Sequence, residues 1–304
     1  MFPIQSPAVL ALILTLAAAP TSANAADRVP APIMLIPESV NTVFVAETST
    51  ALFHRFDRKG ENLQLAGSYY MSIGRGGTGK QRSGDKRTPL GAYFVTEQLD
   101  TSQLHEKYGV TAFPIDYPNA WDHRNNRDGD GIWVHGVDPD KGPRPEFDTD
   151  GCIALRNEDL NSLAPEFRDN ITPVLITSVL HWAEATDVLS LRMELEAKVA
   201  EWASSRADGN LHAYLSLYDD EFERWGLQYP EWSSLIMQSG SLRPVQAATV
   251  SDLLLLDYPE EDGVYLSRFQ LRLQDEGRQT VTTIRLYWHR NADGTLRIIA
   301  ENEG

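Results

Sequence analysis

The chain of 304 residues contains one cysteine, Cys152, and a histidine, His135, precedes it across a single loop. A thiol becomes a useful nucleophile as a thiolate, and a neighbouring imidazole can take up the thiol proton. We therefore predict that Cys152 attacks a carbonyl group, with His135 as general base and then general acid. The alternative is a buried structural thiol, the ordinary state of a free cysteine. The residues around Cys152 favour the catalytic interpretation.

Glycines adjoin both members of this pair. The run Ile132-Trp133-Val134-His135-Gly136 predicts a strand that ends at the histidine, and Gly151 predicts a tight turn just before the nucleophile. A backbone carbonyl such as that of Gly136 can accept the Nδ1 proton of the imidazole and so fix its tautomer. The backbone N–H groups of Gly151 and Cys152 are natural donors to the oxyanion of a tetrahedral intermediate.

The strands that must position this pair are predicted by short runs of β-branched and aromatic residues bounded by turn-forming residues. These runs cover residues 41–47, 69–73, 91–96, 132–134 and 174–176. They indicate a mostly β first domain that ends near Val179.

Beyond Val188 the apolar residues recur at helical spacing, which predicts a long helix broken at Asp208-Gly209. A second short helix is expected over residues 211–218. The remainder alternates between apolar and polar residues, which predicts strands, with a hairpin turn at Asp293-Gly294. The second half is therefore expected to be a smaller α+β domain.

The charge balance restricts the partners. Lys and Arg number 27 against 43 Asp and Glu, so the net charge is −16. Such a field repels phosphate polymers and anionic bilayer surfaces. We therefore predict no nucleic-acid partner.

The first residues have the pattern of an export signal. An apolar run over residues 8–19 is followed by Ala23-Asn24-Ala25, the small-x-small pattern that precedes a cleavage point. We predict a signal peptide over residues 1–25, a mature start at Ala26 and a periplasmic location. The alternative is an uncleaved anchor, but the run is shorter than the ~20 residues that a spanning helix needs. We predict that the chain is not an integral membrane protein.

No metal or other cofactor is predicted. The acidic turn at residues 126–131 resembles the start of a calcium-binding loop, but its twelfth position would be Val137, which cannot be a ligand.

The catalytic block resembles a known family. His135-Gly136 followed by Thr149-x-Gly151-Cys152-Ile153 is similar to the signature of the YkuD-type L,D-transpeptidases, a His followed by Ser/Thr-x-Gly-Cys and an aliphatic residue. Segments 72–74, 84–91 and 117–119 are also similar to this family and point to its YafK-like branch.

The resemblance implies a mixed, β-rich catalytic domain over residues 26–180 that acts on peptidoglycan stem peptides. The donor in this family is typically a tetrapeptide stem that is cut between meso-diaminopimelate and D-Ala, which leaves a thioester on the cysteine. Carried over to this chain, the family roles fall on Cys152, His135, Gly136 and Gly151. Thr149 matches the Ser/Thr position and is implied to contact substrate.

One departure from the family pattern concerns substrate binding. Many members have Arg or Asn where this chain has Ala154, and the Arg or Asn of those members is expected to contact a substrate carboxylate. We expect Arg156, or the upstream Arg82 and Arg87, to take its place, because an arginine fork suits a carboxylate.

Residues 187–304 resemble the NTF2-like cones attached to some members of this branch, including L,D-carboxypeptidases that set cell shape in curved bacteria. Four aromatic residues either line a pocket for a sugar or peptide or simply form the core: Trp202, Tyr214, Tyr218 and Trp225.

The acceptor of the acyl group stays open. An amine acceptor makes the protein a transpeptidase. Water makes it a hydrolase, either an L,D-carboxypeptidase that trims tetrapeptides to tripeptides or an amidase that detaches a wall-bound lipoprotein. A catalytically silent wall-binding module is disfavoured by the intact pair of Cys152 and His135.

Overall fold

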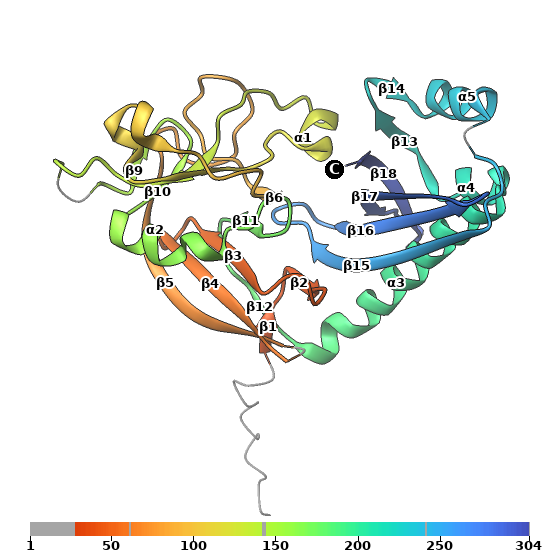
Figure 1. Cartoon of the computed structure of the whole chain (residues 1–304), viewed down its shortest axis with the longest axis horizontal. Helices are drawn as coiled ribbons and strands as arrows, with labels where there is room; N and C mark the ends of the chain where they lie inside the picture. Colours follow the sequence, from red (N-terminus) through yellow and green to blue (C-terminus); the bar gives the residue numbers. More distant parts are fainter. Residues whose placement is uncertain (1–27, 61, 142–143, 241, 304) are drawn as a thin grey trace, which may run out of the picture.

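The computed structural model describes residues 28–303 except 61, 142–143 and 241. The described chain forms two halves, each built on its own sheet (Figure 1). The predicted signal peptide, residues 1–25, lies outside the described residues. Among those that are described, no helix is both long and apolar enough to cross a bilayer.

The first half contains a sheet whose strands run in the spatial order β6-β11-β3-β4-β5-β10-β8-β7, with β9 paired to β5. The bounds are β3 (Thr42–Glu47), β4 (Leu52–Lys59), β5 (Asn62–Gly74), β6 (Gly91–Phe94), β7 (Ala112–Pro114), β8 (Trp133–His135), β9 (Phe147–Thr149), β10 (Ile153–Leu155) and β11 (Pro173–Thr177). All five strands expected from the sequence are present within this set, because their apolar residues form the core. Phe44, for example, stacks on Phe53 and Phe167 with ring centroids 5.0 and 4.4 Å apart.

Short helices fill the connections of this sheet. They are η2 (Thr101–Gln103), η3 (Glu106–Tyr108), α1 (Ala120–Arg124), α2 (Asn157–Leu163) and η4 (Ala164–Glu166). Asn119 begins α1 with a capping box, in which its side chain accepts from the Asp122 N–H and the Asp122 carboxylate accepts from the Asn119 N–H. Helix α2 follows β10 directly, so the chain passes from the nucleophile through one short strand into a helix.

The second half consists of three helices and a sheet ordered β14-β13-β18-β17-β16-β15-β2. The bounds are α3 (Ala185–Asp208), α4 (Leu211–Leu215), β13 (Tyr218–Arg224), β14 (Leu227–Gln228), α5 (Tyr229–Ser239), β15 (Ala247–Asp257), β16 (Val264–Asp275), β17 (Arg278–Arg290) and β18 (Leu296–Glu303). Helix α3 ends at Gly209, where φ is +64°, as the Asp-Gly pair predicts. The expected hairpin turn at Asp293-Gly294 joins β17 to β18, whereas α5 was not expected from the sequence.

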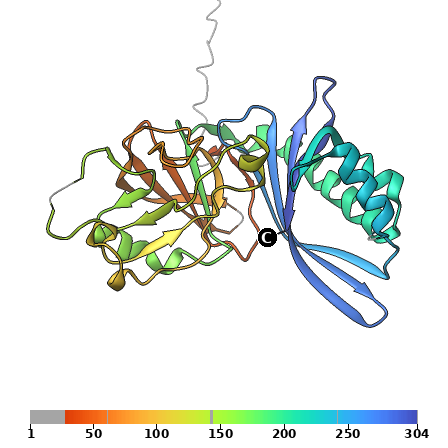
Figure 2. The same ribbon diagram turned by 90° about the horizontal axis from the view of Figure 1, so that it is seen from above.

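Helix α3 runs along one face of this second sheet (Figure 2). Its buried residues pack on strand residues, with Trp202 and Phe269 in edge-to-face contact at 5.6 Å. Tyr214 and Tyr218 are also buried, and with Trp202 they belong to the core of this half. Trp202 and Tyr214 in addition line a cavity of about 250 Å³, so for these two residues both expected roles apply. Trp225 differs, because 70% of it is exposed in the turn between β13 and β14.

The first described residues connect the two halves. Strand β2 (Ile33–Leu35) pairs antiparallel with β15, and β1 (Arg28–Pro30) pairs antiparallel with β12 (Trp182–Glu184). The residues of β2 fall within the 26–180 range expected for the first domain, yet they complete the sheet of the second half. The pairing partner of a three-residue strand depends on distant residues, so the sequence pattern around it does not indicate the partner.

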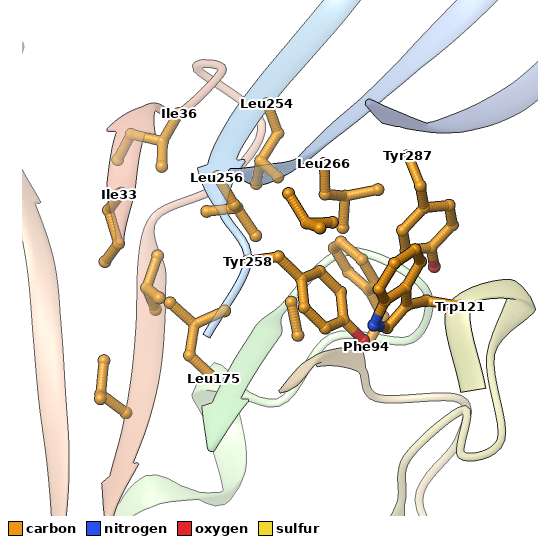
Figure 3. Close-up of a cluster of buried hydrophobic side chains, with 14 of the residues drawn as sticks. Ile33, Ile36, Phe94, Trp121, Leu175, Leu254, Leu256, Tyr258, Leu266 and Tyr287 are labelled. Carbon is orange, nitrogen blue, oxygen red and sulfur yellow. The ribbon is translucent and has the colours of Figure 1, made fainter. Parts of the chain in front are cut away.

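One apolar cluster crosses the boundary between the halves (Figure 3). From the second half, Leu254, Leu256, Tyr258, Leu266 and Tyr287 contribute buried side chains to it, together with Ile33 of β2. From the first half come Phe94, Trp121 and Leu175, and Ile36 follows β2. Because all of these residues are buried together, the two halves share a hydrophobic core.

Candidate active site

Two parallel strands bring the predicted nucleophile and base together. β10 begins directly after Cys152 and pairs in parallel with β8, which ends at His135. The register joins Ile153 to Val134 and Ala154 to His135. Alternate residues of a strand point to the same face, so Val134 and Ile153 enter the core, and Cys152 and His135 are directed to the other face.

His135 is buried and held by its neighbour. Its Nδ1 lies 2.6 Å from the Gly136 carbonyl oxygen. A carbonyl only accepts, so Nδ1 carries the proton and Nε2 is left as the basic nitrogen. Burial lowers the pKa of His135 to about 4; the bond to Gly136 raises it, and the positive charges of Arg144 and Lys107 lower it further.

Cys152 is 9% exposed, and its Sγ donates to the Gly131 carbonyl at 3.3 Å. Burial raises the pKa of the thiol, while a hydrogen bond from the Trp133 backbone N–H and the positive charge of Lys107 lower it. With the thiol pKa raised and the imidazole pKa lowered, thiol and imidazole are both neutral near pH 7. If Cys152 acts as the nucleophile, its thiolate would therefore have to form during attack, with the proton passing to the imidazole.

The turn before the nucleophile is closed by Thr149. Its hydroxyl donates to the Cys152 carbonyl at 2.7 Å and accepts from the Gly151 N–H at 3.1 Å. Gly151 has φ of +127°, and a Cβ there would lie 2.8 Å from the Arg87 carbonyl oxygen, so only glycine fits. The Gly151 N–H, predicted to stabilise an oxyanion, is thus engaged by Thr149 in this structure. Thr149 shapes the turn from a buried position.

Asn157, at the start of α2, was not identified from the sequence. Its Oδ1 accepts from the Val137 N–H at 2.9 Å, and its Nδ2 donates to the Val137 carbonyl at 2.8 Å. A Cβ on Gly136 would lie 2.2 Å from the same Oδ1. Asn157 therefore fixes the backbone next to the carbonyl that orients His135. An asparagine near a helix start has many ordinary roles, so no sequence signal distinguishes this one.

The three arginines proposed for substrate binding lie in separate surroundings. The guanidinium of Arg156 bonds Asp159 through two nitrogens, at 2.7 and 3.1 Å. Arg87 Nη1 donates to the Thr78 carbonyl at 2.9 Å. Arg82 belongs to the same loop as Arg87, where its N–H donates to Asp85 at 3.0 Å. Contact of these side chains with substrate stays a prediction.

Two further cations, which the sequence did not suggest, lie close to residues of the pair and of its turn. Lys107 Nζ is 4.9 Å from the centre of the Tyr108 ring, and that ring meets the His135 ring edge-on at 5.2 Å. Arg75 donates its backbone N–H to the Thr149 carbonyl at 2.9 Å. These residues come from separate stretches of the chain, so only the folded protein brings them together.

Comparison with known proteins identifies both halves. Residues 43–176 match the L,D-transpeptidase catalytic domain family, YkuD, and residues 194–302 match the Cds6 C-terminal NTF2-like domain family. No curated protein sequence matches the chain significantly.

Two solved structures are similar over nearly the full length. Bd1075 of Bdellovibrio bacteriovorus is 25% identical, with a TM-score of 0.73 over 91% of this chain and 98% of that chain. The helical cell shape determining protein Pgp2 of Campylobacter jejuni is 23% identical, with a TM-score of 0.75 over 90% of this chain and 95% of that chain. The chain therefore shares the two-domain fold of these proteins.

Proposed function

This chain carries a YkuD-type L,D-transpeptidase catalytic domain joined to an NTF2-like domain, and from that premise we propose that it is a peptidoglycan-modifying cysteine acyltransferase. Its substrate is a tetrapeptide stem, and Cys152 forms a thioester with the meso-diaminopimelate carbonyl as D-Ala leaves. The parallel register of β8 and β10 supports this most directly, because it directs His135 and Cys152 to one face of the sheet.

The proposed proton path uses the tautomer that the contact between His135 Nδ1 and the Gly136 carbonyl implies. His135 Nε2 accepts the Cys152 proton as Sγ bonds the carbonyl carbon, and the imidazolium then gives that proton to the departing D-Ala amine. The Gly136 carbonyl stabilises the imidazolium at Nδ1, 2.6 Å away. In the second half of the reaction an acceptor amine or water attacks the thioester, and His135 takes up the acceptor's proton.

The second candidate is a hydrolase on the same thioester, with the L,D-carboxypeptidase and the lipoprotein-detaching amidase as its two forms. The structural similarity to Pgp2, a cell shape determining protein, agrees with a role in shaping the wall. Peptidoglycan as substrate also places the protein outside the cytoplasm, and we propose the periplasm, reached through the predicted signal peptide.

Mass spectrometry of muropeptides tests the proposal. Purified tetrapeptide muropeptides incubated with the protein should lose D-Ala. Cross-linked dimers then indicate transfer to an amine, and tripeptides indicate hydrolysis. A wall-bound lipoprotein released from sacculi, without either product, would indicate the amidase. If no muropeptide changes and no protein is released, while the protein still binds sacculi, the proposed chemistry is wrong and a binding module remains.

A further inference from the structure

Four cationic side chains line a cavity of about 430 Å³ near the proposed catalytic pair. We call three of them, Arg75, Lys107 and Arg144, the basic cluster. Arg75 follows β5, Lys107 lies in η3 and Arg144 precedes β9. The rest of the lining consists of His105, Val137, Asp138, Lys141, Pro145 and Asp148. Such a concentration of positive side chains is unexpected in a protein with a net charge of −16.

The cluster is close enough to act on the reacting groups. Lys107 reaches the catalytic histidine through the Tyr108 ring, with distances of 4.9 Å and 5.2 Å along this path. Arg75 bonds the Thr149 carbonyl through its backbone N–H at 2.9 Å and its Nε at 3.3 Å. Arg75 is thereby attached to the turn that carries the nucleophile.

Arg75 and Lys107 are only weakly paired with carboxylates. Asp150 lies 3.6 Å from both Arg75 and Lys107, beyond hydrogen-bond distance, and its side chain is 54% exposed. Exposed pairs of this kind contribute little and separate readily. Arg144 pairs with Asp148 at 3.2 Å, and the remaining lining pair, Lys141 and Asp138, lies 3.2 Å apart.

We propose that Arg75 and Lys107 form the carboxylate-binding subsite for the stem peptide, with Asp150 as an internal carboxylate that the substrate displaces. The inference rests on the proposed function and names the recognition element of the same site. Two carboxylates of a tetrapeptide stem fit this chemistry: the terminal carboxylate of D-Ala and the side-chain carboxylate of diaminopimelate. Charge-assisted bonds to a guanidinium and an ammonium suit either one.

Equilibrium binding to the Cys152→Ala protein tests the subsite without turnover. The ligands are the natural tetrapeptide stem, a stem whose D-Ala ends in a carboxamide, and a stem with lysine in place of diaminopimelate. Lys107→Gln and Arg75→Gln should each weaken binding of the natural stem by about 10- to 100-fold. For the stem that lacks the recognised carboxylate, each substitution should change binding by less than about twofold. That stem therefore identifies which of the two carboxylates the subsite binds.

Matched controls come from the second half of the chain. Lys198, paired with Glu201 at 2.9 Å, and Arg243, paired with Asp275 at 3.0 Å, are replaced by Gln in the same background. Neither change should alter binding. Asp150→Asn should tighten binding of the natural stem several-fold, because it removes the competing carboxylate.

Equal losses on all three stems, or no loss on any, would overturn the inference. Weaker binding by Asp150→Asn would contradict the displacement. A failure of the proposed function gives a different result. In that case the wild-type protein does not turn over the natural stem, but Cys152→Ala still prefers stems with the recognised carboxylate. The subsite would then be supported and the proposed chemistry would be wrong. If Cys152→Ala binds none of the stems, the subsite is wrong, whatever the turnover of the wild type.

Discussion

At the scale of single residues, the proposed chemistry depends on one thiol and one neutral imidazole, carried by the neighbouring strands β10 and β8. Cys152 is the single cysteine of the chain, and its proton is held by the Gly131 carbonyl at 3.3 Å. With the thiol and the imidazole both uncharged at rest, the proposed nucleophile would be generated only as the substrate arrives. Such an arrangement would protect the thiol from oxidation, because the thiolate is the reactive form.

We expect Cys152→Ala to abolish acylation, with a loss of several orders of magnitude in rate, because no other group can form the thioester. A carbapenem should add one covalent mass to the wild type and none to the variant, as measured by intact-protein mass spectrometry. Thermal unfolding of the variant serves as the control for folding. Residual turnover within about tenfold of wild type would exclude the thioester mechanism.

The buried imidazole should also make stability depend on pH. Because the pKa of His135 falls from 6.5 to about 4 on folding, the unfolded chain binds the proton more readily than the folded one. The free energy of unfolding therefore has its full value above pH 6.5 and decreases as the pH falls towards 4. The decrease should reach about 3 kcal/mol.

Urea unfolding at several pH values measures this contribution. His135→Gln should show a pH dependence flatter by about 3 kcal/mol between pH 7 and pH 4, whatever its absolute stability. Leu235→Ala, at an exposed position of α5 that carries no titratable group, should keep the wild-type slope. Identical slopes for wild type and His135→Gln would show that the imidazole is not held neutral by burial.

At the scale of elements, helix α2 positions the base although it supplies no reacting group. Asn157 makes two hydrogen bonds to the Val137 backbone, at 2.9 and 2.8 Å, and its Oδ1 occupies the space beside Gly136. Strand β8, the two hydrogen bonds of Asn157 and the Gly136 carbonyl together fix the direction of His135 Nε2. Small errors in such a direction are costly in rate.

Asn157→Ala should therefore lower kcat by about 10- to 100-fold while the nucleophile remains intact. Asn157→Asp keeps the acceptor for the Val137 N–H and should lose less. Ser162→Ala, an exposed position on the same helix, controls for changes in α2 itself. Steady-state release of D-Ala measures the effect. A full rate in Asn157→Ala would show that strand β8 alone orients the imidazole.

At the scale of the whole molecule, the two halves share a core, and we expect them to unfold as one unit. The shared cluster joins the first half to Leu254, Leu256 and Tyr258 of the second (Figure 3). Polar contacts cross the same boundary: Asn119 Nδ2 donates to the Tyr258 hydroxyl at 3.0 Å, and Arg127 pairs with Glu261 at 2.6 Å. Burial of this kind couples the stability of the catalytic half to the NTF2-like half.

Leu256→Ala tests this coupling, because Leu256 is fully buried at the boundary. The change should cost about 2 to 5 kcal/mol. Labelling of the single thiol of Cys152 in urea reports unfolding of the first half, and near-ultraviolet circular dichroism reports both halves. We expect the two transitions to coincide and to shift together.

Leu235→Ala, at a position of α5 that is 46% exposed, is the control and should shift neither transition. Thiol labelling that keeps its wild-type midpoint in Leu256→Ala would show that the catalytic half folds independently.

Local patterns in the sequence were sufficient for several features. The apolar and β-branched content of 41–47 predicted β3, the helical spacing after Val188 predicted α3, and Asp208-Gly209 predicted its end. Cys152 was predicted to be the nucleophile because it stands alone in a Thr-x-Gly-Cys motif, and this role stays a prediction. In each case neighbouring residues carry the information, since periodicity, turn chemistry and motif spacing are properties of short segments.

Tertiary structure decided what depends on distant residues. The pairing of β2 with β15 and the basic cluster both join segments that are far apart in the chain. Arg156 was an equally good choice as a carboxylate ligand by sequence, yet its guanidinium is bonded to Asp159. A side chain's residue type is local, but its free hydrogen-bonding capacity, its burial and its neighbours are set by the whole fold.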